Sequence, residues 1–161
     1  MTRSGDLSLL EDPVAVELLA SRVPARLAYS WTDGSPRVVP IWFHWDGSAV
    51  VMATPAGSPK LKALRRHPEV ALTIDTDSFP AHVLSLRGPV EVQPVDGPPP
   101  EYLAAARRYL GEDQGRAWAA QLQGMPMARL RLVPRWAAVL DFETRFPNAM
   151  ERAMERAQVG G

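Results

Sequence analysis

Residues 37–68 read RVVPIWFHWDGSAVVMATPAGSPKLKALRRHP and contain two strand-like segments followed by a short basic segment. The strand-like segments, RVVPIWFHW and AVVMAT, are rich in β-branched and aromatic residues, and Asp46-Gly47 lies between them. The Asp-Gly pair is favoured in tight hairpin turns, because both residues tolerate the backbone conformation that these turns require. The stretch therefore predicts an antiparallel hairpin that leads into a basic segment.

The strand pattern continues on both sides of this stretch. Upstream, ARLAYSW precedes Asp33-Gly34, a second dipeptide typical of hairpins; downstream, VALTID and HVLSLRGPVEVQPV continue the pattern. Gly88-Pro89 within the last segment indicates a bulge or an edge, because proline has no amide hydrogen to donate to a neighbouring strand. We therefore expect the sheet to curl at this point.

Helical patterns occur in three regions. Asp12-Pro13 provides an N-cap residue and a proline at the first helical position, which predicts a short helix that ends before Pro24. Residues 98–123 are rich in Ala, Leu, Glu and Arg on both sides of Gly111, which predicts an insertion of two helices between strands. Two more strand-like segments, MARLRLV and WAAVLDF, follow, and residues 147–161 predict a surface helix in a flexible tail.

Six or seven short strands joined by tight turns favour a mainly β fold, a small antiparallel barrel with helical insertions. A parallel sheet would need more helices than the chain offers. The chain has 161 residues, of which 46% are hydrophobic, and this is enough for the core of one domain. We therefore expect a single domain over residues 1–161.

The composition argues against several classes of function. Eighteen basic and eighteen acidic residues balance, so no long-range field attracts nucleic acid or an acidic membrane. The absence of cysteine removes thiolate chemistry and Cys-ligated metals, and the three histidines lack the spacing of metal ligands, so no metal is expected. No signal peptide or apolar run of about 18 residues is present, which indicates a cytoplasmic protein without a membrane partner. No serine lies in a nucleophile-elbow sequence, and no catalytic residue is assigned.

The basic segment contains both lysines of the chain, Lys60 and Lys62. Ser58-Pro59 has the sequence of an N-cap followed by a first helical residue, which predicts a helix that starts at Ser58. The free amides of a helix N-terminus, with the Ser58 hydroxyl and the Lys60 ammonium, could hold a phosphate. The alternative is that the basic residues form only the solvated face of a short helix.

The stretch from 37 to 68 resembles the flavin-binding core of the pyridoxamine 5'-phosphate oxidase-like proteins, the FMN-binding split-barrel superfamily that also contains deazaflavin-dependent enzymes. The matching residues are Arg37 and Val39 on the strand, then Thr54, Ser58, Lys60, Leu64 and Pro68. The resemblance is clear over residues 25–92. It implies a Greek-key-like split β-barrel.

The resemblance also implies a cofactor site. The residues that it places against the flavin are Arg37, Thr54, Ser58 and Lys60 at the phosphate or ring, Val39, Pro40 and Trp42 along the isoalloxazine, and Lys62 as a neighbour. Two positions depart from the pyridoxamine phosphate oxidases, because Pro59 replaces a phosphate-binding arginine and Trp42 replaces a lysine. The flat ring of Trp42 suits stacking on a cofactor, and it equally suits packing inside a barrel.

By this resemblance, the chain is expected to be an FMN-binding oxidoreductase that acts on a small conjugated or heteroaromatic substrate, since a flavin supplies the redox chemistry. A homodimer is also implied, with the cofactor at its interface and the strand around Trp136 contributed by the second subunit. The insertion at 98–123 is expected to shape the substrate entrance.

Three alternatives remain: a 5-deazaflavin coenzyme on the same fold, a non-catalytic flavin- or heme-binding protein, and a cofactor-free interaction module. The C-terminal substrate-binding signature of true pyridoxamine phosphate oxidases has no match, so vitamin B6 synthesis is not expected.

Overall fold

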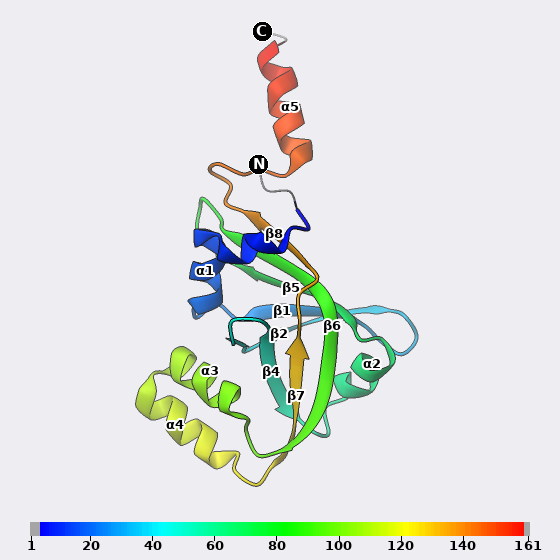
Figure 1. Cartoon of the computed structure of the whole chain (residues 1–161), viewed down its shortest axis with the longest axis vertical. Helices are drawn as coiled ribbons and strands as arrows, with labels where there is room; N and C mark the ends of the chain where they lie inside the picture. The colour runs from blue at the N-terminus through cyan, green and yellow to red at the C-terminus, as the bar shows by residue number, and fades with distance from the viewer. Residues whose placement is uncertain (1–3, 160–161) are drawn as a thin grey trace.

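The computed structural model describes residues 4–159, and its centre is one antiparallel sheet of eight strands. The strands are β1 (Ala25–Ser30), β2 (Pro36–Ile41), β3 (His44–Trp45), β4 (Val50–Pro55), β5 (Glu69–Asp75), β6 (Val83–Asp96), β7 (Pro126–Leu132) and β8 (Trp136–Leu140). Their order is β2-β1-β5-β6-β7-β4-β3, and β8 pairs with β6. The sheet curls into a half-barrel (Figure 1), which confirms the predicted antiparallel fold.

The long strand β6 carries the chain from one part of the sheet to the other. Its first half pairs with β5 and β8, and its second half pairs with β7. The change of partner falls at Gly88-Pro89, where a Cβ added to Gly88 would lie 2.3 Å from the Val133 carbonyl oxygen. Only glycine leaves room for this approach, so the predicted curl at the dipeptide is confirmed.

The strand predicted over residues 37–45 is interrupted, so the sheet has eight strands and not six or seven. It forms β2 and β3, with Trp42 and Phe43 between them. The Phe43 side chain is fully buried in the core, and its carbonyl accepts a hydrogen bond from the Arg108 guanidinium. A side chain from a distant helix therefore satisfies a backbone group that a sheet partner would otherwise satisfy.

Helices flank the half-barrel (Figure 1). They are the 3-10 helix η1 (Leu7–Glu11), α1 (Pro13–Ala20), α2 (Lys60–Arg66), α3 (Pro100–Leu110), α4 (Glu112–Gln121) and α5 (Asn148–Val159). The Asp12 carboxylate caps α1 by accepting a hydrogen bond from the Val14 amide at 2.9 Å, which confirms the predicted first helix. Helices α3 and α4 occupy the region of the expected insertion, and α5 projects away from the barrel.

Helix α3 is tied to the barrel at both ends. At its start, Glu101 accepts hydrogen bonds from Nε and Nη2 of Arg129 on β7. Near its end, Arg108 donates to the carbonyls of Ser21 and Phe43. Helix α4 then packs closely on α3 at Gly115, where an added Cβ would lie 2.5 Å from the Arg107 amide nitrogen. The helix pair is therefore fixed at the rim of the half-barrel.

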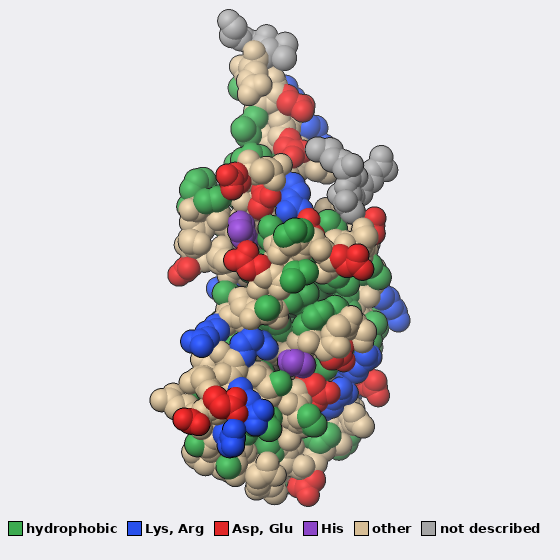
Figure 2. Space-filling model, turned by 60° about the vertical axis from the view of Figure 1, so that its left-hand side comes forward, with side chains coloured by type: hydrophobic (Ala, Val, Ile, Leu, Met, Phe, Trp, Pro, Cys, Tyr) green, Lys and Arg blue, Asp and Glu red, His purple; other side chains and the backbone are tan. Residues whose placement is uncertain are grey.

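The surface carries charges of both signs. Figure 2 shows basic and acidic side chains interspersed on the face that carries the insertion, with apolar side chains between them. None of the helices within residues 4–159 has both the length and the apolar character needed to cross a bilayer.

Candidate functional site

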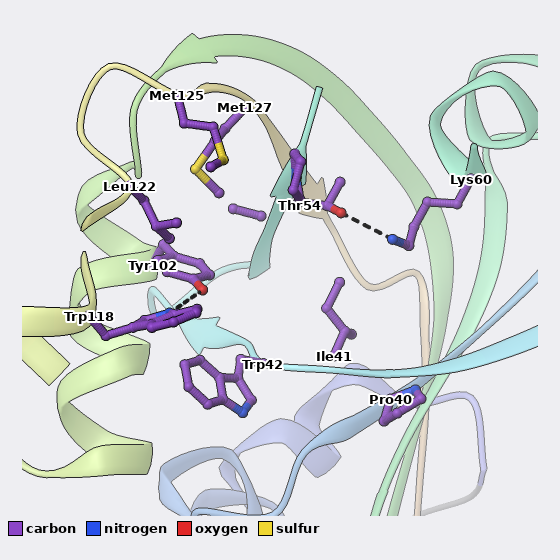
Figure 3. A pocket seen from close by; sticks show the side chains of 12 residues that line it. Pro40, Ile41, Trp42, Thr54, Lys60, Tyr102, Trp118, Leu122, Met125 and Met127 are labelled. Carbon is purple, nitrogen blue, oxygen red and sulfur yellow. Dashed lines mark hydrogen bonds between the residues drawn. The ribbon is translucent and has the colours of Figure 1, made fainter. Parts of the chain in front are cut away.

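An open cavity of about 380 Å³ lies where the end of β2 meets β4, α2 and the α3–α4 pair (Figure 3). Four residues predicted from the sequence contribute to its wall: Pro40, Trp42, Thr54 and Lys60. The insertion and the segment that follows it contribute Tyr102, Trp118, Leu122, Met125 and Met127. The cavity therefore joins the strand and helix of the predicted site to the insertion.

One end of the cavity is polar. The Lys60 ammonium donates a hydrogen bond to the Thr54 hydroxyl at 3.0 Å, and the Ser58 hydroxyl lies 2.7 Å from the same oxygen. Burial lowers the pKa of the Lys60 ammonium, because desolvation disfavours its charged form. Within residues 4–159, no carboxylate lies within ion-pair distance of Lys60. A half-buried cation with only neutral partners is suited to binding an anion.

The structure corrects the predicted start of the helix in this region. Helix α2 begins at Lys60, and the Ser58 hydroxyl makes no capping hydrogen bond. The Ser58 hydroxyl faces Thr54 at the end of β4, and only the Ser58 carbonyl takes part in the helical turn, accepting from the Leu61 amide at 3.1 Å. The prediction was wrong because it considered only hydrogen bonds within the local segment. The partner of the Ser58 hydroxyl is Thr54 on the neighbouring strand β4.

The other residues implied by the resemblance lie outside the cavity wall. Arg37 is exposed on β2, donates to the Pro36 carbonyl at 3.1 Å, and its guanidinium lies 5.6 Å from the centre of the Trp31 ring. Val39 is half-buried against the core, and Lys62 is exposed on α2. Their contact with a cofactor therefore stays a prediction.

The opposite end of the cavity is apolar and aromatic. The Trp42 ring stacks on Tyr109, with 5.0 Å between ring centres and 11° between planes, and it lies 6.2 Å from the Tyr102 ring. One face of Trp42 is therefore covered by protein. Trp118 Nε1 donates a hydrogen bond to the Tyr102 hydroxyl at 2.9 Å, and this bond joins α3 to α4.

Sequence reasoning missed Tyr102 and Trp118. They are 16 residues apart and lie on different helices, so only the close packing of α3 on α4 brings them together. Gly115 inside a helical pattern was the available signal, since a glycine there indicates close approach of another backbone.

The arrangement suits a flat ring with an anionic group. The Lys60 ammonium and the Thr54 hydroxyl lie at one end, and aromatic and thioether side chains lie at the other (Figure 3). In the part of the chain described here, no cluster of three or more acidic or histidine side chains could hold a metal ion.

Comparison with known proteins identifies relatives of this architecture. Residues 12–138 match the family described as pyridoxamine 5'-phosphate oxidase. A search among curated proteins found no match.

Three solved structures illustrate the range of similar proteins. A conserved hypothetical protein from Mycobacterium tuberculosis is 23% identical with a TM-score of 0.64, over 78% of this chain and 81% of the other. An F420 reductase is 27% identical with a TM-score of 0.60, over 75% of this chain and 93% of the other. The heme storage protein HutZ from Vibrio cholerae is 17% identical with a TM-score of 0.56, over 76% of this chain and 89% of the other. The first and third of these likenesses show a shared fold.

Proposed function

The chain belongs to the pyridoxamine 5'-phosphate oxidase family, and from this premise we propose that it binds FMN in the cavity and acts as an oxidoreductase on a small conjugated or heteroaromatic substrate. The observation that carries the proposal is Lys60, a half-buried cation whose only hydrogen-bond partner among the described residues is the neutral Thr54 hydroxyl. Keeping an ammonium desolvated without a carboxylate is costly unless an anion binds beside it. The terminal phosphate of FMN is such an anion.

The residues present fit this cofactor in part. Lys60 and the hydroxyls of Thr54 and Ser58 would hold the phosphate, while Pro40 and the exposed edge of Trp42 would bound the ring. When bound, a flavin supplies hydride and electron transfer, and the chain has only to bind the ring, orient it and exclude water. Pro59 offers no charge where the pyridoxamine phosphate oxidases have an arginine, so Lys60 is the principal cation of the site.

The 5-deazaflavin coenzyme is the second candidate. The likeness to an F420 reductase at 27% identity supports it, because the coenzyme also carries a phosphate that Lys60 would contact. Both candidates use the same polar end of the cavity, so one set of variants tests both.

We also propose that two copies of the chain form a dimer that covers β2. Among the residues that the structure describes, this strand lies at one edge of the sheet and pairs only with β1. It leaves Val38 65% exposed, and Pro36, Arg37 and Pro40 are exposed beside it. The chain runs from this edge directly into the cavity wall at Pro40 and Trp42, so a second copy seated on β2 would close the open side of the cavity.

The proposal is tested by titrating the protein with FMN, riboflavin and the deazaflavin coenzyme separately, following visible absorption and flavin fluorescence. Lys60→Met keeps the length of the side chain and removes the charge. The lost charge-assisted hydrogen bond is worth about 1.5–3 kcal/mol, so FMN affinity should fall about 10- to 150-fold. Riboflavin lacks the phosphate, and its affinity should change by less than about twofold.

Arg66→Met is the matched control, because it removes one positive charge from an exposed position on the same helix that is not among the predicted cofactor contacts. Exposed charges contribute little, so its effect on FMN affinity should stay below about fivefold. Equal losses in the two variants would show that only net charge matters, and binding of neither cofactor would leave a cofactor-free barrel.

A further inference from the structure

The Tyr102 hydroxyl has an unused hydrogen at the apolar end of the cavity. It accepts the hydrogen bond from Trp118 Nε1 at 2.9 Å, and Figure 3 shows this bond at the cavity wall. A phenolic hydroxyl can donate one hydrogen bond in addition to those it accepts. Within residues 4–159, the Tyr102 hydroxyl makes no other hydrogen bond. Its hydrogen is therefore available to a ligand.

The position of this hydroxyl is fixed before any ligand binds. Trp118 holds the oxygen, and the close contact of α4 with α3 at Gly115 fixes the two helices that carry the pair. The neighbouring residue Glu101 is bonded to Arg129 on β7, which anchors the same turn of α3 to the barrel. A hydroxyl that already accepts one hydrogen bond is also a stronger donor, since the two bonds polarise each other.

The surroundings of the hydroxyl restrict which ligand can use it. Leu122, Met125 and Met127 contribute apolar surface, and the Trp42 ring lies 6.2 Å from the Tyr102 ring. Lys60 is the only charged residue among those that line the cavity, and it belongs to the polar end. A charged group at the aromatic end would lose its water without gaining a partner, which is strongly unfavourable. Flat aromatic rings, by contrast, fit between aromatic and thioether side chains.

The geometry points to Tyr102 as the residue that selects substrates: it donates a hydrogen bond to an acceptor atom of a flat, uncharged aromatic molecule bound beside α3 and α4. The inference rests on the proposed function, because this subsite then adjoins the cofactor, and it extends that function by naming the substrate class. Tyr102 acts here as a positioning and specificity residue.

The test compares quinoline with naphthalene, two molecules of nearly the same shape that differ by one acceptor nitrogen. Each is titrated into the full chain, with and without FMN, and the indole N–H signal of Trp118 is followed by ¹H–¹⁵N NMR after assignment with Trp118→Phe. We expect quinoline to bind about five- to tenfold more tightly than naphthalene, as one neutral hydrogen bond of about 1 kcal/mol allows. In Tyr102→Phe, which keeps the ring and loses the hydroxyl, the preference should disappear or reverse, because the quinoline nitrogen then loses its water without gaining a partner.

Three results would overturn the inference: equal affinity for the two molecules in the unaltered protein, a preference that survives in Tyr102→Phe, or binding of neither. The cofactor proposal is judged separately by the FMN titrations of Lys60→Met. A preference for quinoline in a protein that does not bind FMN would support the Tyr102 subsite and refute the proposed cofactor. Binding of FMN without a preference for quinoline would support the cofactor and refute the subsite. Thermal unfolding of Tyr102→Phe serves as the control for folding.

Discussion

Breaking the ion pair between Glu101 and Arg129 should destabilise the protein. It should also loosen the attachment of α3, which carries Tyr102 at the aromatic end of the cavity, to β7. Arg129 lies on β7 and Glu101 opens the helix that carries Tyr102. The two side chains are 19% and 20% exposed, respectively, so neither is well solvated. Glu101→Gln removes the charge with little change of shape and leaves the Arg129 guanidinium partly buried without its carboxylate.

The size of the effect follows from this burial. Exposed pairs contribute about 0–1 kcal/mol, and breaking a fully buried pair costs about 3–5 kcal/mol. Both hydrogen bonds from Arg129 reach the same oxygen of Glu101, and the other oxygen, Oε2, is buried without a partner, so the geometry is not the best possible. We therefore expect a loss of about 2 kcal/mol, which for a chain of this size lowers the melting temperature by about 4–8 °C.

A double-mutant cycle isolates the pair. The variants are Glu101→Gln, Arg129→Met and the two combined, measured by urea unfolding. The matched control is Glu69→Gln, which breaks an exposed pair with Arg135 whose side chains are 66% and 69% exposed; it should cost less than about 1 kcal/mol. A coupling energy between Glu101 and Arg129 below about 0.5 kcal/mol would refute the reasoning.

The same pair gives a pH dependence of defined sign. The hydrogen bond from Arg129 lowers the pKa of Glu101 below its ordinary value of 4.5. The stabilisation is therefore complete above pH 4.5 and is lost as the pH falls through the lowered value in the folded protein. The difference in stability between the unaltered protein and Glu101→Gln should shrink below pH 4.5, and a constant difference would contradict this assignment.

Two further predictions concern the insertion and the β2 edge. Gly115→Ala should lower the melting temperature by about 2–6 °C despite the better helix propensity of alanine, because its Cβ would lie 2.5 Å from the Arg107 amide nitrogen and the two helices must separate. An unchanged or higher melting temperature would contradict this close packing. Light scattering should give a mass of twice the 17.7 kDa chain, and Val38→Asp should return it to the monomer value. A monomer in the unaltered protein would refute the proposed dimer.

Local chemistry made much of the fold predictable. Asp33-Gly34 and Asp46-Gly47 form the expected turns, and both glycines adopt positive φ angles, 86° and 96°. β6 changes its partner at Gly88-Pro89. Gly88 has no side chain and Pro89 has no amide hydrogen, and both properties act on the backbone at the same position. Turns and breaks of this kind depend only on residues adjacent in the sequence, so they can be predicted from the sequence alone.

The candidate site was predictable only in part. Pro40, Trp42, Thr54 and Lys60 line one cavity, and their contact with a cofactor stays a prediction. The Ser58 hydroxyl was misassigned because its partner lies on β4 and not in its own helix. The contacts of Tyr102 with Trp118 depend on how two helices pack, which no local pattern specifies.

The two ends of the cavity therefore come mainly from different parts of the chain. The polar end comes from Thr54, Ser58 and Lys60, which lie within the stretch that resembles the flavin-binding core of the family. The aromatic end comes from Trp42 and from residues within 102–127, a range that includes α4 and most of α3. In the proposed complex with FMN, the substrate would approach the ring from the side that is bounded by Tyr102, Trp118 and the two methionines. A change in the insertion can thus alter the substrate while the cofactor motif stays the same, so relatives that share the motif need not share the reaction.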